Sequence, residues 1–323
     1  MPAPLSRAFS RPAAVFFHGV EREISDPAIQ NNHHSRDEFV KIARALKESF
    51  DVLPLAALAD VMKRPSHNSR ALFLMSDDGY ANTLSVAADI LDDLKLPWAL
   101  FVSTDHVDTG EANPMLVARL FFAEAADGVY RIPHIEPSIV LAGTYQREAE
   151  ELRVMSEVTR LDAACARETI AAMREVTGNP VRRWHSERFL KWDEVRALQR
   201  RGVEIGAHAR WHWPMNASQS SATLRDQVVK SKTRIEKEIG RCRYFAYPFG
   251  QPCDVGRGAW AAVRDAGFEN AFTTVAGTLD ASVNPWLLPR YGLGLTERNV
   301  VSLIAMLRAG NPRLRRWQQQ MAA

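Results

Sequence analysis

Short apolar stretches alternate with longer stretches of helical periodicity along most of this 323-residue chain. Ala71–Met75 is apolar at every position, which is typical of a strand buried on both faces of a parallel sheet. Because parallel neighbours need a helical crossover, the alternation predicts a parallel sheet or a βα barrel. We expect strands at Ala14–Phe17, Ala71–Met75, Trp98–Val102, Gly202–Ile205, Tyr244–Tyr247, Ala271–Thr274 and Leu287–Tyr291. We expect helices at Ser35–Ser49, Tyr80–Leu94, Lys191–Arg201, Ala222–Ile239 and Arg257–Ala266.

The alternation stops between Thr104 and His185, a stretch far longer than the roughly 2–6 residues of an ordinary βα connection. Within it, Gly143–Thr177 has the apolar spacing of a helix and is followed by Gly178, a typical helix stop. We therefore expect residues 105–185 to be a helical insertion within a single domain that spans residues 1–323. Residues 296–323 are expected to form a C-terminal helix and a basic tail. The arginines there favour a solvated helix end over contact with an anion.

Composition excludes several classes of protein. The 41 Lys and Arg and 38 Asp and Glu leave a net charge of +3, too small for the footprint of a nucleic-acid binder. Three cysteines in the whole chain exclude a disulfide scaffold and fit a reducing compartment. No apolar run approaches the roughly 20 residues of a transmembrane helix, and the apolar stretch Pro12–Phe17 is too short for a secretory signal. We expect a cytoplasmic protein without a transmembrane segment.

Two adjacent carboxylates, Asp77 and Asp78, follow the buried strand Ala71–Met75 and precede Gly79. Their mutual repulsion would be relieved if a cation bound one of them, which would leave the other free to act as a base. A plain Asp-Asp-Gly turn at the start of a helix has the same sequence, because Asp is a good helix cap. Both interpretations stay open at this point.

Two histidines, His208 and His212, follow the strand Gly202–Ile205. At positions i and i+4 they would share one face of a helical turn, a spacing found among zinc ligands. A pair of surface or hydrogen-bonded histidines is the alternative. In α/β barrels the carboxyl ends of the strands carry the active site. Since Asp78 lies at an equivalent strand end, the three side chains together predict a metal site with one position open for water.

These motifs resemble, in order and spacing, those of the polysaccharide deacetylase (NodB-homology) family, carbohydrate esterase family four. Met75–Gly79 is similar to the family's Thr-Phe-Asp-Asp-Gly, and His208–His212 to His-Ser/Thr-x-x-His. Ala246–Gly250 is similar to Arg-x-Pro-Tyr/Phe-Gly, and Phe16–Val20 to the Tyr-His-x-Val segment near the start of many members. The resemblance covers roughly residues 14–104 and 185–292, so the insertion lies outside it.

The resemblance implies a distorted (β/α) TIM-like barrel and a metal-dependent hydrolase that acts on non-peptide C–N amide bonds. It implies that Asp78, His208 and His212 bind the metal and that Asp77 is the general base. Zn²⁺ is the expected metal, with Co²⁺, Ni²⁺ or Mn²⁺ as alternatives that the ligand types allow. A bound Zn²⁺ can lower the pKa of its water to about 7, which supplies the nucleophile.

The general acid departs from the commonest pattern of the family. Many members use a histidine in a late Leu-x-x-His motif, whereas the last histidine of this chain is His212. The strongest substitute is His18, because it lies at the carboxyl end of the first expected strand. His106 and His185 are weaker candidates, which we expect at the surface of the insertion.

The third motif also departs from the family, because Ala246 stands where an arginine normally orients the base. Arg290, which follows a late strand, is the expected replacement. Four aromatic residues near the motifs are candidates for binding the substrate, with core packing as the alternative for the tryptophans. They are Tyr247, Phe249, Trp211 and Trp213.

The resemblance favours an N-deacetylase that hydrolyses the acetamido group of an amino sugar during glycan or glycoconjugate biosynthesis. The sugar would be free or linked to a nucleotide, a lipid or a glycan, with no nucleic acid as partner. One alternative is an amidase or deformylase acting on a formamido sugar or another small amide. Another is a non-catalytic, sugar-binding relative. An apolar face on the insertion would be a natural patch for a homo-oligomer.

Overall fold

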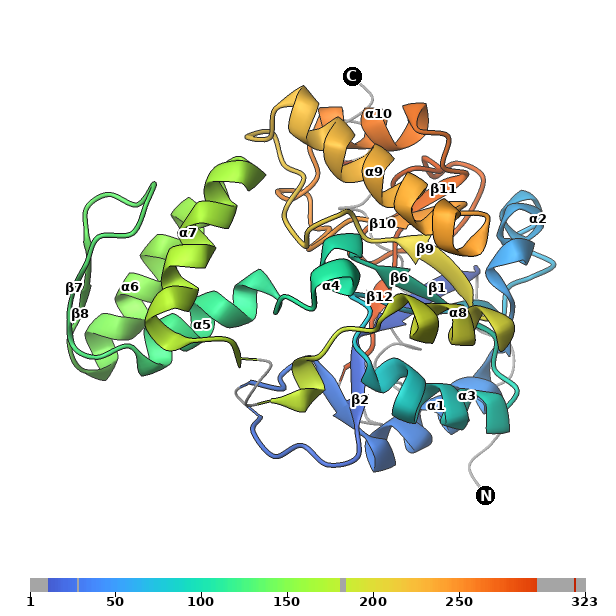
Figure 1. Cartoon of the computed structure of the whole chain (residues 1–323). Helices are drawn as coiled ribbons and strands as arrows, with labels where there is room; N and C mark the ends of the chain where they lie inside the picture. Colours follow the sequence, from blue (N-terminus) through green and yellow to red (C-terminus); the bar gives the residue numbers. More distant parts are fainter. Residues whose placement is uncertain (1–10, 28, 181–183, 295–316, 318–323) are drawn as a thin grey trace.

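The computed structural model describes residues 11–27, 29–180, 184–294 and Trp317, and a curled parallel sheet forms its centre (Figure 1). The strands follow the order β11-β10-β9-β6-β5-β1-β12, and β4 pairs with the first two residues of β5. Their bounds are β1 Ala13–Phe17, β4 Asp51–Val52, β5 Ala71–Ser76, β6 Trp98–Val102, β9 Glu204–Ala207, β10 Tyr244–Ala246, β11 Asn270–Phe272 and β12 Tyr291–Gly292. The α/β barrel class expected from the sequence is confirmed.

One late segment joins the two ends of the curled sheet. Leu288 forms a parallel bridge with Phe272 of β11, while Tyr291 of β12 pairs with Val15 of β1. Successive strand residues alternate between two apolar clusters, with Val15 packed on the helices and Phe16 in the barrel interior. This alternation is why the strands are apolar at every position. The carboxyl ends of the strands consequently meet at one rim.

Helices cover the outside of the sheet (Figure 1). They are α1 Arg36–Ser49, η2 Thr83–Ala87, α3 Ala88–Asp93, α8 Trp192–Arg200, α9 Ser221–Ile239 and α10 Arg257–Asp265. Two further helices, η1 Leu55–Ala57 and α2 Leu58–Lys63, pack instead against the interior cluster that contains Phe16. Two of the outer helices, α1 and α9, begin with a side-chain cap: Ser35 accepts a hydrogen bond from Glu38 N, and Ser220 accepts one from Thr223 N. A short parallel pair forms between β2 (Gly19–Glu21), which follows β1 in the chain, and β3 (His33–Ser35).

The expected helices and six of the seven expected strands are confirmed with shifted ends, and one helix is shorter than predicted. The strand expected at Leu287–Tyr291 is wrong over most of its length, because Leu288 forms only an isolated bridge and β12 begins at Tyr291. Instead of one helix over Tyr80–Leu94, a π-helical turn (η2) leads into α3. Tyr80 is held outside the helix because it forms an antiparallel bridge with Phe189 and stacks on its ring at 5.1 Å. This contact is tertiary, so the local periodicity does not reveal it.

The stretch between β6 and α8 carries its own elements, and most of them stand to one side of the barrel (Figure 1). They are α4 Thr104–Thr109, α5 Pro114–Glu124, β7 Gly128–Tyr130, β8 Ile139–Leu141, α6 Gly143–Val158, α7 Ala163–Thr177 and η4 His185–Glu187. We call residues 114–177 the lobe. The single helix expected over Gly143–Thr177 is two helices, because the chain turns after Val158 and Asp162 caps α7 through Ala164 N.

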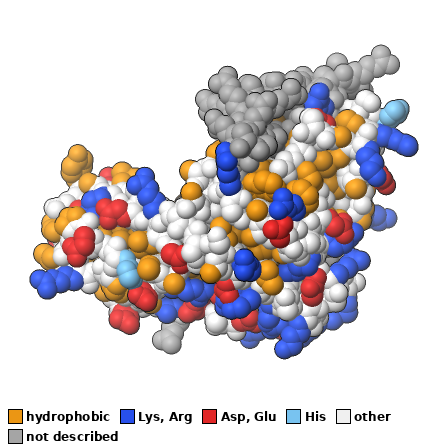
Figure 2. Space-filling view, turned by 90° about the horizontal axis from the view of Figure 1, so that it is seen from above, with side chains coloured by type: hydrophobic (Ala, Val, Ile, Leu, Met, Phe, Trp, Pro, Cys, Tyr) orange, Lys and Arg blue, Asp and Glu red, His pale blue; other side chains and the backbone are white. Residues whose placement is uncertain are grey.

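The lobe has an apolar core of its own, in which Phe121 of α5 packs with Val154 of α6 and Met173 of α7. Its outer surface exposes several apolar side chains among charged ones (Figure 2). Tyr145 is 88% exposed and Leu152 is 76% exposed. The homo-oligomer suggested by the sequence stays a prediction.

Two expectations concern other parts of the chain. The C-terminal helix and basic tail predicted over residues 296–323 lie outside the described residues, apart from Trp317, which is buried against the main core. Among the helices that the structure describes, none has the length and apolar content needed to cross a bilayer.

Candidate active site and metal centre

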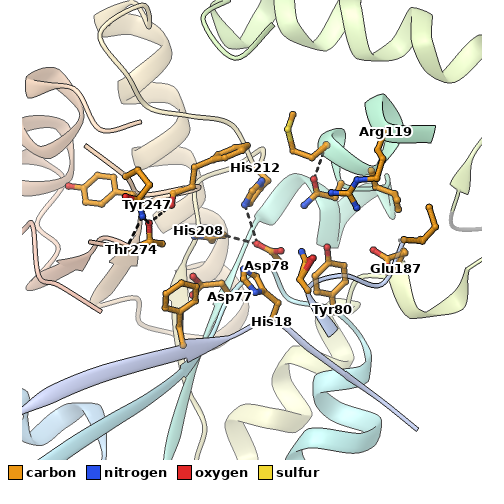
Figure 3. Close-up of a pocket in the computed structure, with 18 residues that line it drawn as sticks. His18, Asp77, Asp78, Tyr80, Arg119, Glu187, His208, His212, Tyr247 and Thr274 are labelled. Carbon is orange, nitrogen blue, oxygen red and sulfur yellow. Dashed lines mark hydrogen bonds and ion pairs between the residues drawn. The ribbon is translucent and has the colours of Figure 1, made fainter. Parts of the chain in front are cut away.

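The rim of the barrel surrounds a cavity of about 390 Å³, within the size range of small-molecule sites (Figure 3). His18 follows β1, and Asp77 and Asp78 follow β5. His208 follows β9, and Tyr247 follows β10. All of these side chains line the cavity. Residues more than 200 positions apart therefore meet because parallel strands end at the same rim.

Asp78 lies between the two histidines of the predicted metal site. Its Oδ1 is 3.3 Å from Nε2 of His208 and 3.2 Å from Nε2 of His212. One ligand atom from each of the three residues lies within 4.8 Å of the others. Asp78 adopts a positive φ of 72° and Gly79 one of 90°, so the chain turns sharply where the carboxylate enters the cavity.

The structure also fixes the orientation of one imidazole. Nδ1 of His208 lies 2.8 Å from the carbonyl oxygen of Ala246, so the proton on Nδ1 is donated to that carbonyl. In the neutral ring Nε2 then carries no proton and is directed at Asp78, the arrangement that a metal-ligating histidine needs. Ala246 therefore supplies a backbone contact at the motif position where the family's arginine is absent.

The donor set fits a divalent cation. Among the described residues, the buried atoms Asp78 Oδ1 and His208 Nε2 have no hydrogen-bond partner of good geometry. Buried polar atoms are almost always satisfied, so two such atoms facing each other indicate a missing ligand. Burial acts to raise the pKa of Asp78, but His212 and His208 hold it well below its usual value, which keeps the carboxylate ionised. Two imidazoles and one carboxylate are a common ligand set of catalytic zinc.

The two histidines do not share a helical turn, so that part of the sequence interpretation is wrong. His208 and His212 lie in an irregular loop after β9, in which Ala209 has a φ of 60°. Thr104 N and Asp105 N donate hydrogen bonds to the carbonyls of this loop and fix it against the start of α4. His208 and His212 both reach Asp78 because the loop folds back, and not because of helical periodicity.

The second carboxylate has a different partner. The guanidinium of Arg290 donates two hydrogen bonds to Asp77, from Nη1 to Oδ1 at 2.8 Å and from Nη2 to Oδ2 at 2.7 Å. Arg290 is fully buried, donates from Nε to Thr273 O at 3.1 Å, and lies over the ring of Phe16. Burial acts to raise the pKa of Asp77, but the charge of Arg290 lowers it below its usual value. The expected contact between these two residues is present.

Three further candidates line the same cavity. His18 is half-buried, and burial lowers the pKa of its imidazole. The Tyr247 hydroxyl donates to Trp286 O at 3.0 Å, so its ring forms part of the wall. Phe249 has a φ of 60° and faces the ring of His212 at 5.0 Å. Tyr247 and Phe249 are placed as the sequence predicts, on the cavity side of the third motif.

The two tryptophans predicted to bind substrate lie elsewhere. Trp211 and Trp213 are 3% and 1% exposed, stack on each other at 4.8 Å and pack in the core of the lobe. Neither lines the cavity. Their substrate-binding assignment is therefore wrong, and core packing explains them. The loop that presents His212 is attached to the lobe through these two rings.

One weaker candidate is also placed differently from expectation. His106 is fully buried, not exposed, and its Nε2 accepts a hydrogen bond from His212 N at 3.4 Å. Burial lowers the pKa of His106 to about 4. His106 is thus a neutral support for the loop of His212. His185 is exposed at the start of η4, as expected.

The sequence interpretation missed the other side of the cavity. Tyr80, Asn113, Arg119 and Glu187 line it there. Burial raises the pKa of Glu187 to about 7, helped by the negative charge of Asp78. The one available signal was the position of Glu187 just ahead of the helix that leads to β9. Its orientation depends on the packing of η4.

Comparisons with known proteins agree with this geometry. A model of the polysaccharide deacetylase family matches residues 154–271. The chain is similar to the Streptococcus pyogenes deacetylase PplD in complex with acetate, at 13% identity and a TM-score of 0.59, over 91% of this chain and 98% of that one. IcaB from Ammonifex degensii gives 14% identity and a TM-score of 0.59, over 93% and 97% of the two chains.

A polysaccharide deacetylase from Bacillus cereus gives 14% identity and a TM-score of 0.55, over 91% of this chain and 69% of that one. No curated protein matches the chain. At these identities the solved structures establish a shared fold, and the family match adds a shared sequence pattern. The resemblance expected from the sequence motifs is confirmed.

Proposed function

Because the chain carries the sequence pattern of the polysaccharide deacetylase family and the fold of its solved structures, we propose that it is a metal-dependent N-deacetylase of an amino sugar. The observation that carries this proposal is the pair of adjacent carboxylates with separate partners. Asp78 faces two histidines, while Asp77 is paired with Arg290. This division leaves Asp78 to bind a cation and Asp77 to accept a proton.

The cation would be held by Asp78, His208 and His212. A divalent cation there would polarise the amide carbonyl and lower the pKa of a neighbouring water molecule. Zn²⁺ fits the ligand set best, and Co²⁺, Ni²⁺ and Mn²⁺ are the alternatives to be compared by reconstitution.

Asp77 is proposed to accept the proton of the attacking water. Arg290 keeps Asp77 ionised and fixes the plane of its carboxylate through two hydrogen bonds, at the wall of the cavity. A bidentate arginine is suited to this because its fork matches the carboxylate geometry. We regard Arg290 as a positioning residue for the base.

His18 is proposed to deliver a proton to the leaving amine. It lines the same cavity as Asp77 and Asp78, and no histidine follows His212 in the chain. Replacement of His18 by Gln is expected to lower the rate on an acetamido sugar by roughly 10²–10⁴-fold. The same variant should hydrolyse 4-nitrophenyl acetate like the wild type, because a nitrophenolate leaves without a proton. Equal losses on both substrates would exclude this role.

Metal content is the direct test of the proposed site. We expect wild type to retain about one equivalent of zinc after loading and exhaustive dialysis, with three protein ligands as in catalytic zinc sites. His212→Ala should retain little, whereas His185→Ala, which removes an exposed histidine, should match wild type. Absence of zinc in wild type would contradict the hydrolytic proposal and favour a sugar-binding relative.

Hydrolysis assays then separate the remaining alternatives. N-acetylated and N-formylated amino sugars would be compared with wild type and the Asp77→Asn variant. We expect release of acetate that depends on Asp77. Release of formate alone would indicate a deformylase, and zinc binding without any hydrolysis would indicate a non-catalytic protein.

A further inference from the structure

The cavity has a second polar side that the hydrolytic mechanism does not use. Figure 3 shows Arg119 and Glu187 on one side of Asp78, and Tyr247 and Thr274 on the other. Arg119 comes from α5 of the lobe, and Glu187 comes from η4. Both lie outside the motifs that carry the family resemblance. This side is therefore available for the part of a substrate beyond its acetamido group.

Arg119 is a half-buried side chain on the wall of the cavity. Its helix is anchored in the lobe core by Phe121 and Phe122, so the guanidinium is presented from a rigid element. Its charge reaches across this side of the cavity, because it acts to lower the pKa of both Glu187 and Tyr80. An arginine carries its charge at all working pH values and matches the oxygens of a carboxylate or phosphate.

The three acidic side chains that line the cavity are largely neutralised once a cation is bound. Asp77 is paired with Arg290, and Asp78 faces the metal-binding histidines. Burial of Glu187 favours its neutral form, with Ser186 Oγ at 3.2 Å and His33 Nδ1 at 3.7 Å from Oε1. The divalent cation then leaves the metal site with a net positive charge, and the Arg119 guanidinium lies on the wall of the same cavity. A neutral sugar does not require that charge, whereas an anionic sugar does.

We propose that Arg119 binds an anionic group on the sugar, a phosphate ester or a carboxylate, and that the substrates are anionic amino sugars. This inference rests on the proposed function and extends it to a class of substrate. Glu187 lies on the same side of the cavity, and its carboxyl, when protonated, can donate a hydrogen bond to an oxygen of the anion.

Binding of sugars that lack an acetamido group to the full-length, zinc-loaded chain tests the site without turnover. The probes are glucose, its 1- and 6-phosphates, glucuronic acid and inorganic phosphate, titrated by calorimetry. We expect at least one anionic sugar to bind about tenfold or more tightly than the neutral sugar, the range of a charge-assisted hydrogen bond. The phosphates and the uronic acid distinguish the two sources of negative charge.

Variants of Arg119 and of a second arginine distinguish a direct contact of Arg119 with the anion from the general positive charge of the lobe. Arg119→Met should lose the preference for the anionic sugar, and Arg119→Lys should keep part of it. Arg131→Met removes an exposed arginine of the same lobe and should keep the full preference. Equal affinities of wild type for neutral and anionic sugars would overturn the proposal. A preference retained by Arg119→Met, or inorganic phosphate binding as tightly as the sugar phosphates, would also overturn it.

A second readout uses the zinc-loaded enzyme. The KM for the preferred anionic sugar should rise about tenfold in Arg119→Met, with kcat little changed, because the lost contact is present before and during the reaction. If the neutral and anionic sugars are hydrolysed with the same KM, the proposed anion site is contradicted and the proposed deacetylase activity stands. If binding depends on Arg119 but no sugar is hydrolysed, the proposed anion site stands and the proposed deacetylase activity is contradicted.

Discussion

The barrel and the lobe contribute to the same cavity in different ways. The barrel supplies Asp77, Asp78 and His208 directly from the carboxyl ends of strands. The lobe supplies Arg119 from α5, and Asn113, which caps that helix, lines the cavity beside it. Barrel side chains are positioned by the pairing of the sheet. Lobe side chains are positioned by how a separate apolar core packs against the barrel.

This difference separates two tasks. The residues proposed for chemistry lie in short segments with local signals, such as two carboxylates and a glycine after a buried strand. The residues proposed for recognition lie on α5 and η4, outside the sequence motifs, and only the position of Glu187 ahead of α8 offered a local signal. The loop of His212 joins the two regions, because Trp211 and Trp213 belong to the lobe core. Variants in each region should therefore affect different measurements.

The largest effect is expected in the barrel, at the proposed base. Asp77→Asn should lower kcat by roughly 10²–10⁴-fold, because a general base contributes that much. Its zinc content should equal that of wild type, since Asp77 faces Arg290 and not the histidines. Asp265→Asn, at an exposed position on α10, is the matched control. Equal rates for Asp77→Asn and wild type would show that another group accepts the proton.

A slightly smaller effect is expected at Arg290, the partner of the proposed base. Arg290→Met leaves the buried Asp77 without its cation and should lower the free energy of unfolding by about 3–5 kcal/mol. The pKa of Asp77 should rise, because the charge that lowers it is gone. Since the base works ionised, the acid limb of the kcat/KM profile should move to higher pH. Arg290→Lys should recover part of that change, and an unchanged acid limb in Arg290→Met would contradict the positioning role.

The lobe offers the contrasting experiment. Met173→Ala removes a fully buried side chain from the lobe core and should cost roughly 2–5 kcal/mol of stability. Zinc content should stay at the wild-type value, while the KM for the sugar should rise because α5 loses support. Val129→Ala, on the exposed hairpin of the lobe, should change stability by less than about 0.5 kcal/mol. Loss of zinc from Met173→Ala would show that the two regions do not act separately.

The smallest effect is expected at Glu187, where lobe and barrel meet. Its pKa is raised to about 7, so the folded state holds a proton that the unfolded chain releases near pH 4.5. The stability that this proton provides is present at low pH and is lost as pH rises through about 7. Wild type should therefore lose roughly 2 kcal/mol relative to Glu187→Gln between pH 5 and pH 8, because a tenfold change in a protonation equilibrium corresponds to about 1.4 kcal/mol. Chemical denaturation at the two pH values measures it, and parallel curves would contradict the raised pKa.

The sequence by itself determined the barrel and its rim. Apolar strands, helical periodicity and the order of three motifs were sufficient to predict the parallel sheet. They also led to Asp77, Asp78, His208 and His212 at one edge. The physical reason is that strand burial and strand ends are local properties, and parallel strands place all their carboxyl ends together.

Only the tertiary structure decided the rest. It moved Trp211 and Trp213 into the lobe core, buried His106 beneath the loop of His212, and brought Arg119 and Glu187 to the cavity. It also set the two-hydrogen-bond geometry of the pair between Arg290 and Asp77, 213 positions apart, which the sequence suggested only through a family resemblance. Each of these outcomes depends on how separately folded elements pack. Packing is set by the shapes of two surfaces that are distant in the chain, so a local pattern carries no record of it.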